Sequence, residues 1–465
     1  MKGFPLNEVP SMGSLNWLLL CAVCLVEGMD MNLLPSSFRA MEAELGFSPN
    51  SLAIFQALQG AAQALSGIAW ANLIDSGHSC KQVVCSGVLG WAVANCILAC
   101  SESVAMICAF RVFNGLCLGM VLPVVQSQIA THVRPEFMGS YFGLLAASMG
   151  LGKIIALAIA APLAEEVVLG VPGWRAALAI TACLSLTIAV AFHLFFHAPS
   201  AATPRHKVDL LEECKKFAGY LGKPTFCVVL CQGLVGTIPN AALSFQLLFM
   251  QYSGLSDTRV AIAASMCVVG TMFGGPLGGY IGDRLERWSK QHGRPFTGQV
   301  SVLLGIPLMY IMFFAPVSPD MFWHFATINF VSGLLAHWAA SGCNQPLLAR
   351  IVPSGSKASV MAWEYSLESL SGQTIGPLSV SLLATHAMKY KTQEMPIADM
   401  PSADRIANAT ALGKGLFIST VFPWMLCAAL YSFLHFCDLS AQDGEGETIL
   451  AKQKTTPKTY AEARL

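Results

Sequence analysis

Charged side chains are scarce in this sequence. Asp, Glu, Lys and Arg make up 12% of its 465 residues, whereas hydrophobic residues make up 54%. A soluble chain carries roughly 25% charged residues, because charge covers its surface. The 27 acidic side chains balance the 27 basic ones, so the chain has no basic field with which to attract nucleic acid. The composition indicates a membrane protein and argues against a nucleic-acid partner.

The sequence also lacks the short motifs of several enzyme classes. There is no GxxxxGK[ST] run, so ATP is not expected to be the direct energy source. HxxxxD, HExxH and GxSxG are also missing, and His132 with Glu136 is a poor substitute. No metal site or cofactor is expected, because most of the sixteen cysteines lie in apolar runs without a metal-binding pattern. We therefore predict that the protein is not an enzyme, and keep a membrane-embedded enzyme as an alternative.

Long apolar runs are what the sequence does contain. A spanning helix needs about 20 mainly apolar residues, and polar segments with Gly and Pro mark its ends. Twelve such runs cover residues 15–34, 52–74, 83–101, 104–131, 138–164, 175–197, 226–250, 260–282, 299–316, 321–349, 358–385 and 414–437. We predict an all-α integral membrane protein with twelve transmembrane helices, arranged in two six-helix bundles that span the lipid bilayer.

Polar segments divide this chain into parts. The prediction is an amino terminus (1–14), a first bundle (15–197), a linker (198–225), a second bundle (226–437) and a disordered tail (438–465). Apolar side chains recur at helical spacing within the linker, at Leu210, Cys214, Phe217 and Leu221. This spacing beside several lysines predicts an amphipathic helix that lies on the inner leaflet.

The distribution of basic residues predicts the orientation. With both termini in the cytoplasm, the cytoplasmic segments carry 18 Lys and Arg and the outer loops carry 7. This bias agrees with the positive-inside rule, and the opposite topology would reverse it. We expect a multi-pass protein with cytoplasmic termini, in a membrane that the sequence does not identify. The sequon at Asn408 then falls in an outer loop close to the last helix, and its use is left open.

One segment concentrates charge directly after a run of glycines. It reads GGYIGDRLERWSKQHGR, from Gly278 to Arg294. Glycines let helix ends approach closely, and the charges can pair at the membrane surface. A similar segment, ANLIDSGHSCK, stands half a chain earlier, and Asp75 and Asp283 are 208 residues apart. A repeat of this kind in a multi-spanning protein is typical of transporters.

These segments resemble the major facilitator superfamily. Its loop motif is matched by Gly279, Asp283, Arg284 and Arg287, and a weaker first copy is matched by Asp75 and Lys81. The stretch from Arg111, RVFNGLCLGMVLPVVQSQ, resembles helix 4 of the family, and GLLAASMGLGK resembles its glycine-rich helix 5. MDMNLLPSSFRAMEAELGFSP is similar to the Spinster-like branch, and the second half resembles plant and algal members.

The resemblance implies two pseudo-symmetric bundles around a cavity and a secondary active transporter. Such a protein moves a small-molecule solute by alternating access, as a monomer and with protons as a candidate coupling ion. Leu118 stands where typical Spinster proteins have a helix 4 glutamate, so that form of proton coupling is not carried over. The alternatives are a facilitator or a lysolipid-type transporter without proton coupling, and a sensor that binds a solute without moving it.

Ionisable residues inside spanning helices are costly and mark functional sites. Glu27 and Asp30 share one face of helix 1, roughly 20 Å from its cytoplasmic end. Arg111 and Lys153 come out at a similar level. The functional interpretation is a midplane site where an acid changes protonation and a base attracts an anionic or amphipathic solute. The alternative is an ion-pair network that only fastens helices together.

Further candidates lie in the second half. Gln232, Asn240 and Asn344 can hydrogen bond to a solute or to neighbouring helices, and His337 can titrate near neutral pH. Glu364 and Glu368 share a face of helix 11, which predicts a gate or a contact within the bundle.

The loop motif carries a separate hypothesis. Asp283, Arg284 and Arg287 form a charge cluster that holds the inner helix ends together when the cavity faces outward.

Overall fold

The computed structural model describes residues 12–75, 78–133, 138–164, 166–197, 210–352, 357–392, 394–395 and 397–437. The tail that the sequence predicts to be disordered, 438–465, lies outside the described residues. So do most of the amino terminus and the first part of the linker.

The first half forms six membrane-length helical segments. The elements are α1 (Ser14–Leu45), α2 (Pro49–Asp75), α3 (Cys80–Ala99), α4 (Val104–Leu118), α5 (Val121–His132), α6 (Met138–Ala164), β1 (Val167–Val168), β2 (Val171–Pro172) and α7 (Gly173–Phe195). α4 and α5 together make one span. The two strands form a short antiparallel hairpin before α7.

The second half begins with the linker helix. Its elements are α8 (Leu210–Tyr220), α9 (Pro224–Gly236), α10 (Ile238–Ala242), η2 (Leu243–Phe245), α11 (Gln246–Tyr252), α12 (Asp257–Trp288), α13 (Gly293–Phe313), η3 (Pro319–Met321), α14 (Phe322–Leu335), η4 (Ala340–Asn344), α15 (Gln345–Ile351), α16 (Lys357–Leu382), η5 (Leu383–Ala387), η6 (Ile397–Asp399) and α17 (Ser402–Leu434). Residues from α9 to α11 make one span. η4 and η5 are π-helical turns.

Ten helical segments in the described part of the chain are long and apolar enough to cross a membrane. They coincide with ten of the twelve predicted spans. The other two, 321–349 and 358–385, coincide with α14–α15 and with α16. A π-helical turn interrupts the first of these, and the second carries two glutamates, which make it less apolar.

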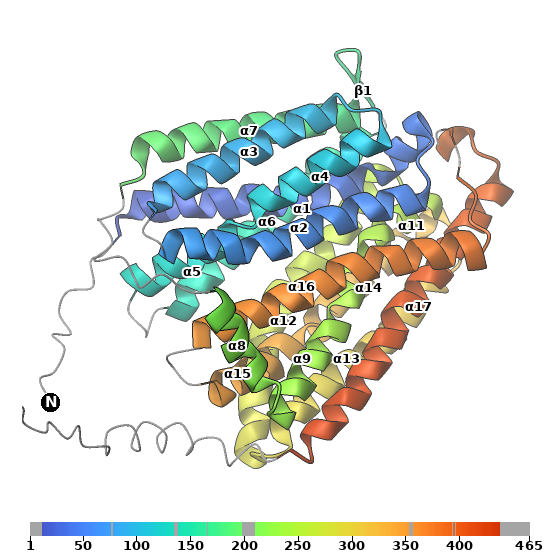
Figure 1. Cartoon of the computed structure of the whole chain (residues 1–465). Coiled ribbons are helices and arrows are strands. Elements are labelled where there is room, and N and C mark those ends of the chain that lie inside the picture. Colours follow the sequence, from blue (N-terminus) through green and yellow to red (C-terminus); the bar gives the residue numbers. More distant parts are fainter. Residues whose placement is uncertain are drawn as a thin grey trace, which may run out of the picture.

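The helices form two bundles that meet along two helix pairs. Within the first bundle α1 packs on α6 and α3 on α7, and within the second α12 packs on α14 and α13 on α17. Between the bundles α2 packs along α16 and α6 along α12. Figure 1 shows the first bundle above and the second below, with helix axes that diverge away from the β hairpin. The end where α1 finishes is termed the distal end, and the end where α1 begins is the proximal end.

Close glycine contacts repeat between the halves. A Cβ on Gly115 of α4 would lie 2.2 Å from the carbonyl oxygen of Gln59 in α2. A Cβ on Gly333 of α14 would lie 2.2 Å from the carbonyl oxygen of Cys267 in α12. Gln59 and Cys267 are separated by the same 208 residues as Asp75 and Asp283. The sequence repeat is therefore also a repeat of helix packing.

Several helices extend beyond their predicted ends, among them α1, α12 and α17. α1 continues past residue 34 to Leu45, α12 continues past 282 to Trp288, and α17 begins at Ser402 rather than at 414. These three extensions contain nine charged residues that the sequence assigns to loops: Arg39, Glu42, Glu44, Asp283, Arg284, Glu286, Arg287, Asp404 and Arg405. Most of these charges have partners inside the fold, which offsets the free-energy cost of burying them in a helix.

The linker contains the predicted helix. Phe217 of α8 is buried, and its ring centroid lies 5.5 Å from that of Phe226 and 6.2 Å from that of Trp363. This apolar side chain therefore contacts α9 and α16 of the second bundle, and the position of the helix on the inner leaflet stays a prediction. Cys214 and Leu221 remain exposed.

Candidate functional site

A close crossing of α1 and α6 brings two opposite charges together. A Cβ on Gly28 would lie 2.0 Å from the carbonyl oxygen of Met149, and a Cβ on Gly152 would lie 1.8 Å from that of Leu25. No side chain fits at either contact, so both positions need glycine for the helices to approach. Glu27 directly precedes Gly28 and Lys153 directly follows Gly152. The close crossing therefore brings the two charged side chains near each other.

Glu27 is an acid with one unused oxygen. Its side chain is 5% exposed, and Gln63 Nε2 donates to its Oε1 at 3.0 Å. Its Oε2 has no hydrogen-bond partner among the described residues. The half-buried Lys153 attracts the carboxylate electrostatically, without a direct ion pair. Glu27 therefore keeps the capacity to bind a proton or a donor from a solute.

Residues of the second bundle face this pair. Tyr365 of α16 lies within electrostatic reach of Glu27, and His337 of the α14–η4 connection lies within reach of Lys153. Tyr365 is 55% exposed, although it lies near the middle of the molecule. His337 Nδ1 is bound to the carbonyl oxygen of Ser332 at 3.2 Å. Glu27, Lys153, His337 and Tyr365 are termed the central cluster.

Asp30 is enclosed by carboxamides. Its side chain is fully buried, and Gln59 Nε2 donates to Oδ2 at 2.7 Å. Asn95 Nδ2 donates to Oδ1 at 2.8 Å, and Asn114 Nδ2 approaches Oδ1 at 3.4 Å. The three amides come from α2, α3 and α4 and join those helices to α1. Sequence reasoning missed them, although polar residues at interior positions of apolar runs were a usable signal.

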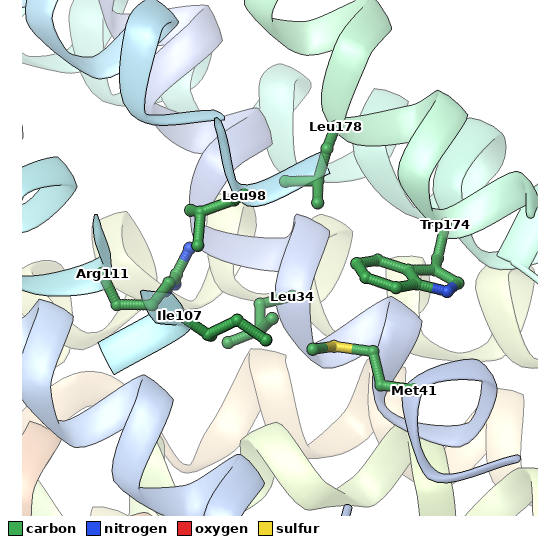
Figure 2. A pocket seen from close by; sticks show the side chains of 7 residues that line it. All are labelled: Leu34, Met41, Leu98, Ile107, Arg111, Trp174 and Leu178. Atoms are coloured by element: carbon green, nitrogen blue, oxygen red, sulfur yellow. The ribbon is translucent and has the colours of Figure 1, made fainter. Parts of the chain in front are cut away.

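Arg111 lies in the same bundle without contacting Asp30 directly. Its side chain is 1% exposed, and neither Nε nor Nη1 has a hydrogen-bond partner in the part of the chain that the structure describes. Asp30 acts on it electrostatically, but the two form no ion pair. The guanidinium instead lines a small cavity, as Figure 2 shows. Asp30 and Arg111 therefore lie in the same region, as predicted, but they are not in direct contact.

A buried polar network joins the two bundles at the distal end. Arg39 Nη1 lies 3.3 Å from Glu42 Oε2, and both side chains are fully buried on α1. From the second bundle, Tyr252 donates to Glu42 Oε2 at 3.0 Å and Tyr390 donates to Oε1 at 2.7 Å. Arg39 also donates to Tyr252 at 3.1 Å and to the carbonyl oxygen of Met395. Arg39, Glu42, Tyr252 and Tyr390 are termed the distal latch.

The environment of Tyr390 keeps its hydroxyl protonated. Burial, followed by the nearby Glu42 carboxylate, raises the pKa of Tyr390 well above its usual value of 10.0. The hydroxyl is therefore available as a donor at any physiological pH.

Additional contacts close this end: Phe38 packs on Phe245 at 4.9 Å between centroids, and Thr385 and Ser381 donate to Asn50 Oδ1.

The glycine-rich segment forms a charge cluster at the proximal end. Arg294 Nη2 lies 2.7 Å from Asp283 Oδ1 and 2.6 Å from Glu286 Oε2, and Arg350 also pairs with Glu286. Arg294 Nη1 donates to the carbonyl oxygen of Gly342 in the π-helical turn at 3.0 Å. All these residues belong to the second bundle. These five residues are termed the proximal cluster.

The arginines predicted for this cluster lie elsewhere. Arg284 and Arg287 are exposed, and Arg287 Nε donates to the backbone oxygen of Asp283 at 3.3 Å. Arg294 and Arg350 supply the cations because they project from α13 and α15 across the end of α12. Gly279 lies beside the π-helical turn, where a Cβ would be 4.0 Å from the oxygen of Ser341. In the first half, Lys81 is half-buried and Asp75 ends α2, its side chain lying outside the described part.

The neutral candidates of the second half bind its helices to each other. Asn344 Nδ2 donates to Gln232 Oε1 at 2.6 Å, and Tyr431 donates to Asn344 Oδ1 at 2.8 Å. This chain joins α9, η4 and α17. Asn240 is exposed on α10.

Glu364 and Glu368 form a pair on α16. They are four residues apart on this helix, so the two acids lie on one face and their like charges repel. Glu368 lies directly against Gly233, where a Cβ would be 1.4 Å from its Oε1. Glu368 therefore faces α9 within its own bundle.

Asn408 has a structural role. Its side chain is 2% exposed, donates to the carbonyl oxygen of Lys391 at 2.7 Å and accepts from its backbone nitrogen at 3.0 Å. The amide nitrogen that would carry a glycan is thus engaged inside the fold, which argues against use of the sequon.

Comparisons with known proteins decide the family. A sequence profile of the Major Facilitator Superfamily matches residues 20–377. The chain belongs to the major facilitator superfamily. It is an integral multi-pass membrane protein of a family of transporters, and its six-plus-six helix arrangement is the fold of that superfamily. No curated protein sequence matches the chain.

Solved structures of other superfamily members share the fold. A bacterial homologue of the human lysosomal transporter Spinster, inward-facing and occupied, gives a TM-score of 0.74 at 19% identity, covering 92% of this chain and 97% of that one. Its inward-facing, unoccupied form gives 0.74 at 18% identity, with 93% and 99% covered. The nucleoside transporter NupG gives 0.65 at 12% identity, with 92% and 99% covered. The Spinster-like expectation therefore holds for the fold, and the plant and algal similarity stays a prediction.

Proposed function

We propose that this superfamily member is a secondary active transporter that moves a small organic solute by alternating access. The central cluster is the solute site. The observation that carries the proposal is the pair Glu27 and Lys153, brought together by glycine contacts between α1 and α6 and within electrostatic reach of Tyr365 and His337 of the second bundle. Ionisable groups at such a depth are retained for function rather than for stability.

The distal latch is the outer gate in this proposal. The excess of basic residues in the proximal segments supports cytoplasmic termini, and therefore a distal end that faces outward. With the latch closed, the described conformation is inward-facing. Two similar structures of a Spinster homologue are inward-facing as well, and the diverging helix axes of Figure 1 agree with this assignment.

The chemistry of the cluster favours an anionic or amphipathic solute. The Lys153 ammonium attracts a carboxylate or phosphate, and Tyr365 and His337 offer hydrogen bonds beside it. Proton coupling is assigned to Glu27 rather than Asp30, because Glu27 keeps a free oxygen whereas three amides occupy the oxygens of Asp30. A facilitator without coupling remains the second candidate, favoured by the neutral Leu118 in helix 4.

Untargeted counterflow identifies the solute. Proteoliposomes containing the full chain are preloaded with a metabolite extract, and mass spectrometry follows which compounds exchange. We expect wild type to exchange a small set of anionic or amphipathic compounds, and Lys153→Met to lose the anionic ones. Lys389→Met, at an exposed turn beyond η5, is the matched control. Binding of a compound without any exchange would instead support a sensor, and conversion of a compound would support an enzyme.

A further inference from the structure

Arg111 points into an apolar cavity inside the first bundle. The cavity volume is about 10 Å³. Its other walls come from α1, α3, α4 and α7 (Figure 2): Leu34, Met41, Leu98, Ile107, Trp174 and Leu178. The Arg111 guanidinium is therefore the one charged group among the lining residues, and its Nε and Nη1 have no hydrogen-bond acceptor in the described part of the chain.

The acids of this region are already engaged. Asp30 holds three amide donors, as described above. Glu44 accepts from the Trp174 indole nitrogen and pairs with Arg175 at 3.0 Å. Leaving a buried guanidinium with unmet donors costs on the order of several kcal/mol. A mobile anion at the donor positions would recover much of that cost.

We propose that this cavity binds a small monovalent inorganic anion, which in a cell is chloride. A cavity of this volume holds about one water molecule; a chloride ion is larger, so the walls must move outward to admit it. Met41 supplies an adaptable wall, because its unbranched thioether can change rotamer. The unpaired Nε and Nη1 of Arg111 beside apolar walls suit a weakly hydrated spherical ion, and the other lining residues supply no free donor for the oxygens of sulfate or phosphate.

The site is separate from the proposed solute site. The central cluster is built from α1 and α6 and faces the second bundle, whereas the cavity is enclosed by helices of the first bundle. A bound anion would tie α4 to α1 and α7 and so stabilise that bundle. Binding can therefore be measured without any transport assay, and its failure would not affect the proposed function.

Thermal melting of the purified full chain tests the proposal. The melting temperature is measured in potassium chloride and in potassium gluconate at equal ionic strength, so that screening is the same in both. We expect a saturable rise in melting temperature with chloride and with bromide, and none with gluconate, because a ligand of the native state alone stabilises it. Equal melting in chloride and gluconate would overturn the proposal, as would a rise with formate alone.

Two variants tie the effect to the cavity. Arg111→Met should lose the chloride-dependent rise, and Lys153→Met, another cation within the membrane, should keep it. Leu178→Phe fills the cavity from its apolar wall and leaves the guanidinium in place, so it should also lose the rise even if Arg111→Met folds poorly. A chloride effect of wild-type size in both Arg111→Met and Leu178→Phe would place the anion elsewhere.

Discussion

The Tyr390 hydroxyl donates to the Glu42 carboxylate at 2.7 Å, and so a residue of the second bundle satisfies an acid buried in the first. The sequence separation between them is 348 residues. Breaking a buried charged network by removing one partner costs about 3–5 kcal/mol, because the other charge stays buried. If the bundles separate at this end, Glu42 and Arg39 must find water instead. The latch can therefore open only together with solvent access.

Tyr390→Phe removes the donor and keeps the ring. A hydrogen bond to a charged group contributes about 1.5–3 kcal/mol, which corresponds to more than a tenfold change in the ratio of closed to open distal ends. We expect the distal end to open more often and labelling of an introduced distal cysteine from the outer side to increase. Tyr280→Phe, at a 60% exposed tyrosine of α12, is the control. Unchanged labelling would mean that Tyr390 only fills space.

Gly28→Ala tests the crossing of α1 and α6. The new methyl group would meet the carbonyl oxygen of Met149 at 2.0 Å, so the helices must move apart. Overpacking of this kind costs about 1–3 kcal/mol, and Glu27 and Lys153 would separate as well. We expect a lower melting temperature and slower exchange of solute. Gly143→Ala is the control, because a Cβ on Gly143 meets nothing within 4 Å. If both variants behave alike, the close approach does not matter.

The proximal cluster predicts an order of effects. Glu286 is the better buried acid, with its side chain 16% exposed, whereas that of Asp283 is 62% exposed. Glu286→Gln leaves Arg294 and Arg350 without their shared anion and should lower the melting temperature more than Asp283→Asn does. Arg284→Gln, at an exposed position, should have no measurable effect. A larger loss for Asp283→Asn would contradict this assignment of partners.

A histidine pair gives the proximal end a pH dependence. His435 Nδ1 lies 2.9 Å from His292 Nδ1, and His435 Nε2 lies 3.0 Å from Gln299 Oε1. Partial burial, followed by the His292 charge, lowers the pKa of His435 from its usual 6.5. The unfolded chain then binds a proton more readily than the native one, so stability falls as pH drops below about 6.5. The decrease in melting temperature between pH 8 and pH 5 should be smaller in His435→Gln; an identical decrease would contradict this.

Much of the fold could be predicted because each membrane span is a continuous run of apolar residues, which can be recognised from neighbouring residues alone. The apolar runs mark ten spans directly, and the glycine-rich repeat at Asp75 and Asp283 indicates the two halves. The distal latch could not be predicted in this way. Arg39 and Glu42 look like loop residues, because the two tyrosines that make their burial tolerable come from distant parts of the chain.

The candidate site shows the same limit. Helical rise placed Glu27, Asp30, Arg111 and Lys153 at one depth, but depth does not say which side chains face each other. The contact of Gly28 with Met149 directs Glu27 toward Lys153, and the amides around Asp30 separate it from Arg111. The polar residues inside apolar runs were a signal for the amides, but which helix faces meet is a matter of rotation and packing that a single sequence does not give.

Alternating access requires the distal latch to open, and cross-linking across it is the most direct test. Asn50 and Ser381 hydrogen bond across the bundle interface beside the latch, so Asn50→Cys with Ser381→Cys should form a disulfide. Counterflow in proteoliposomes is measured after oxidation and again after reduction, with each single variant under the same oxidant to account for the native cysteines. The account predicts that oxidation stops exchange in the double variant alone and that reduction restores it. Exchange that continues at the wild-type rate with the disulfide formed would contradict the account.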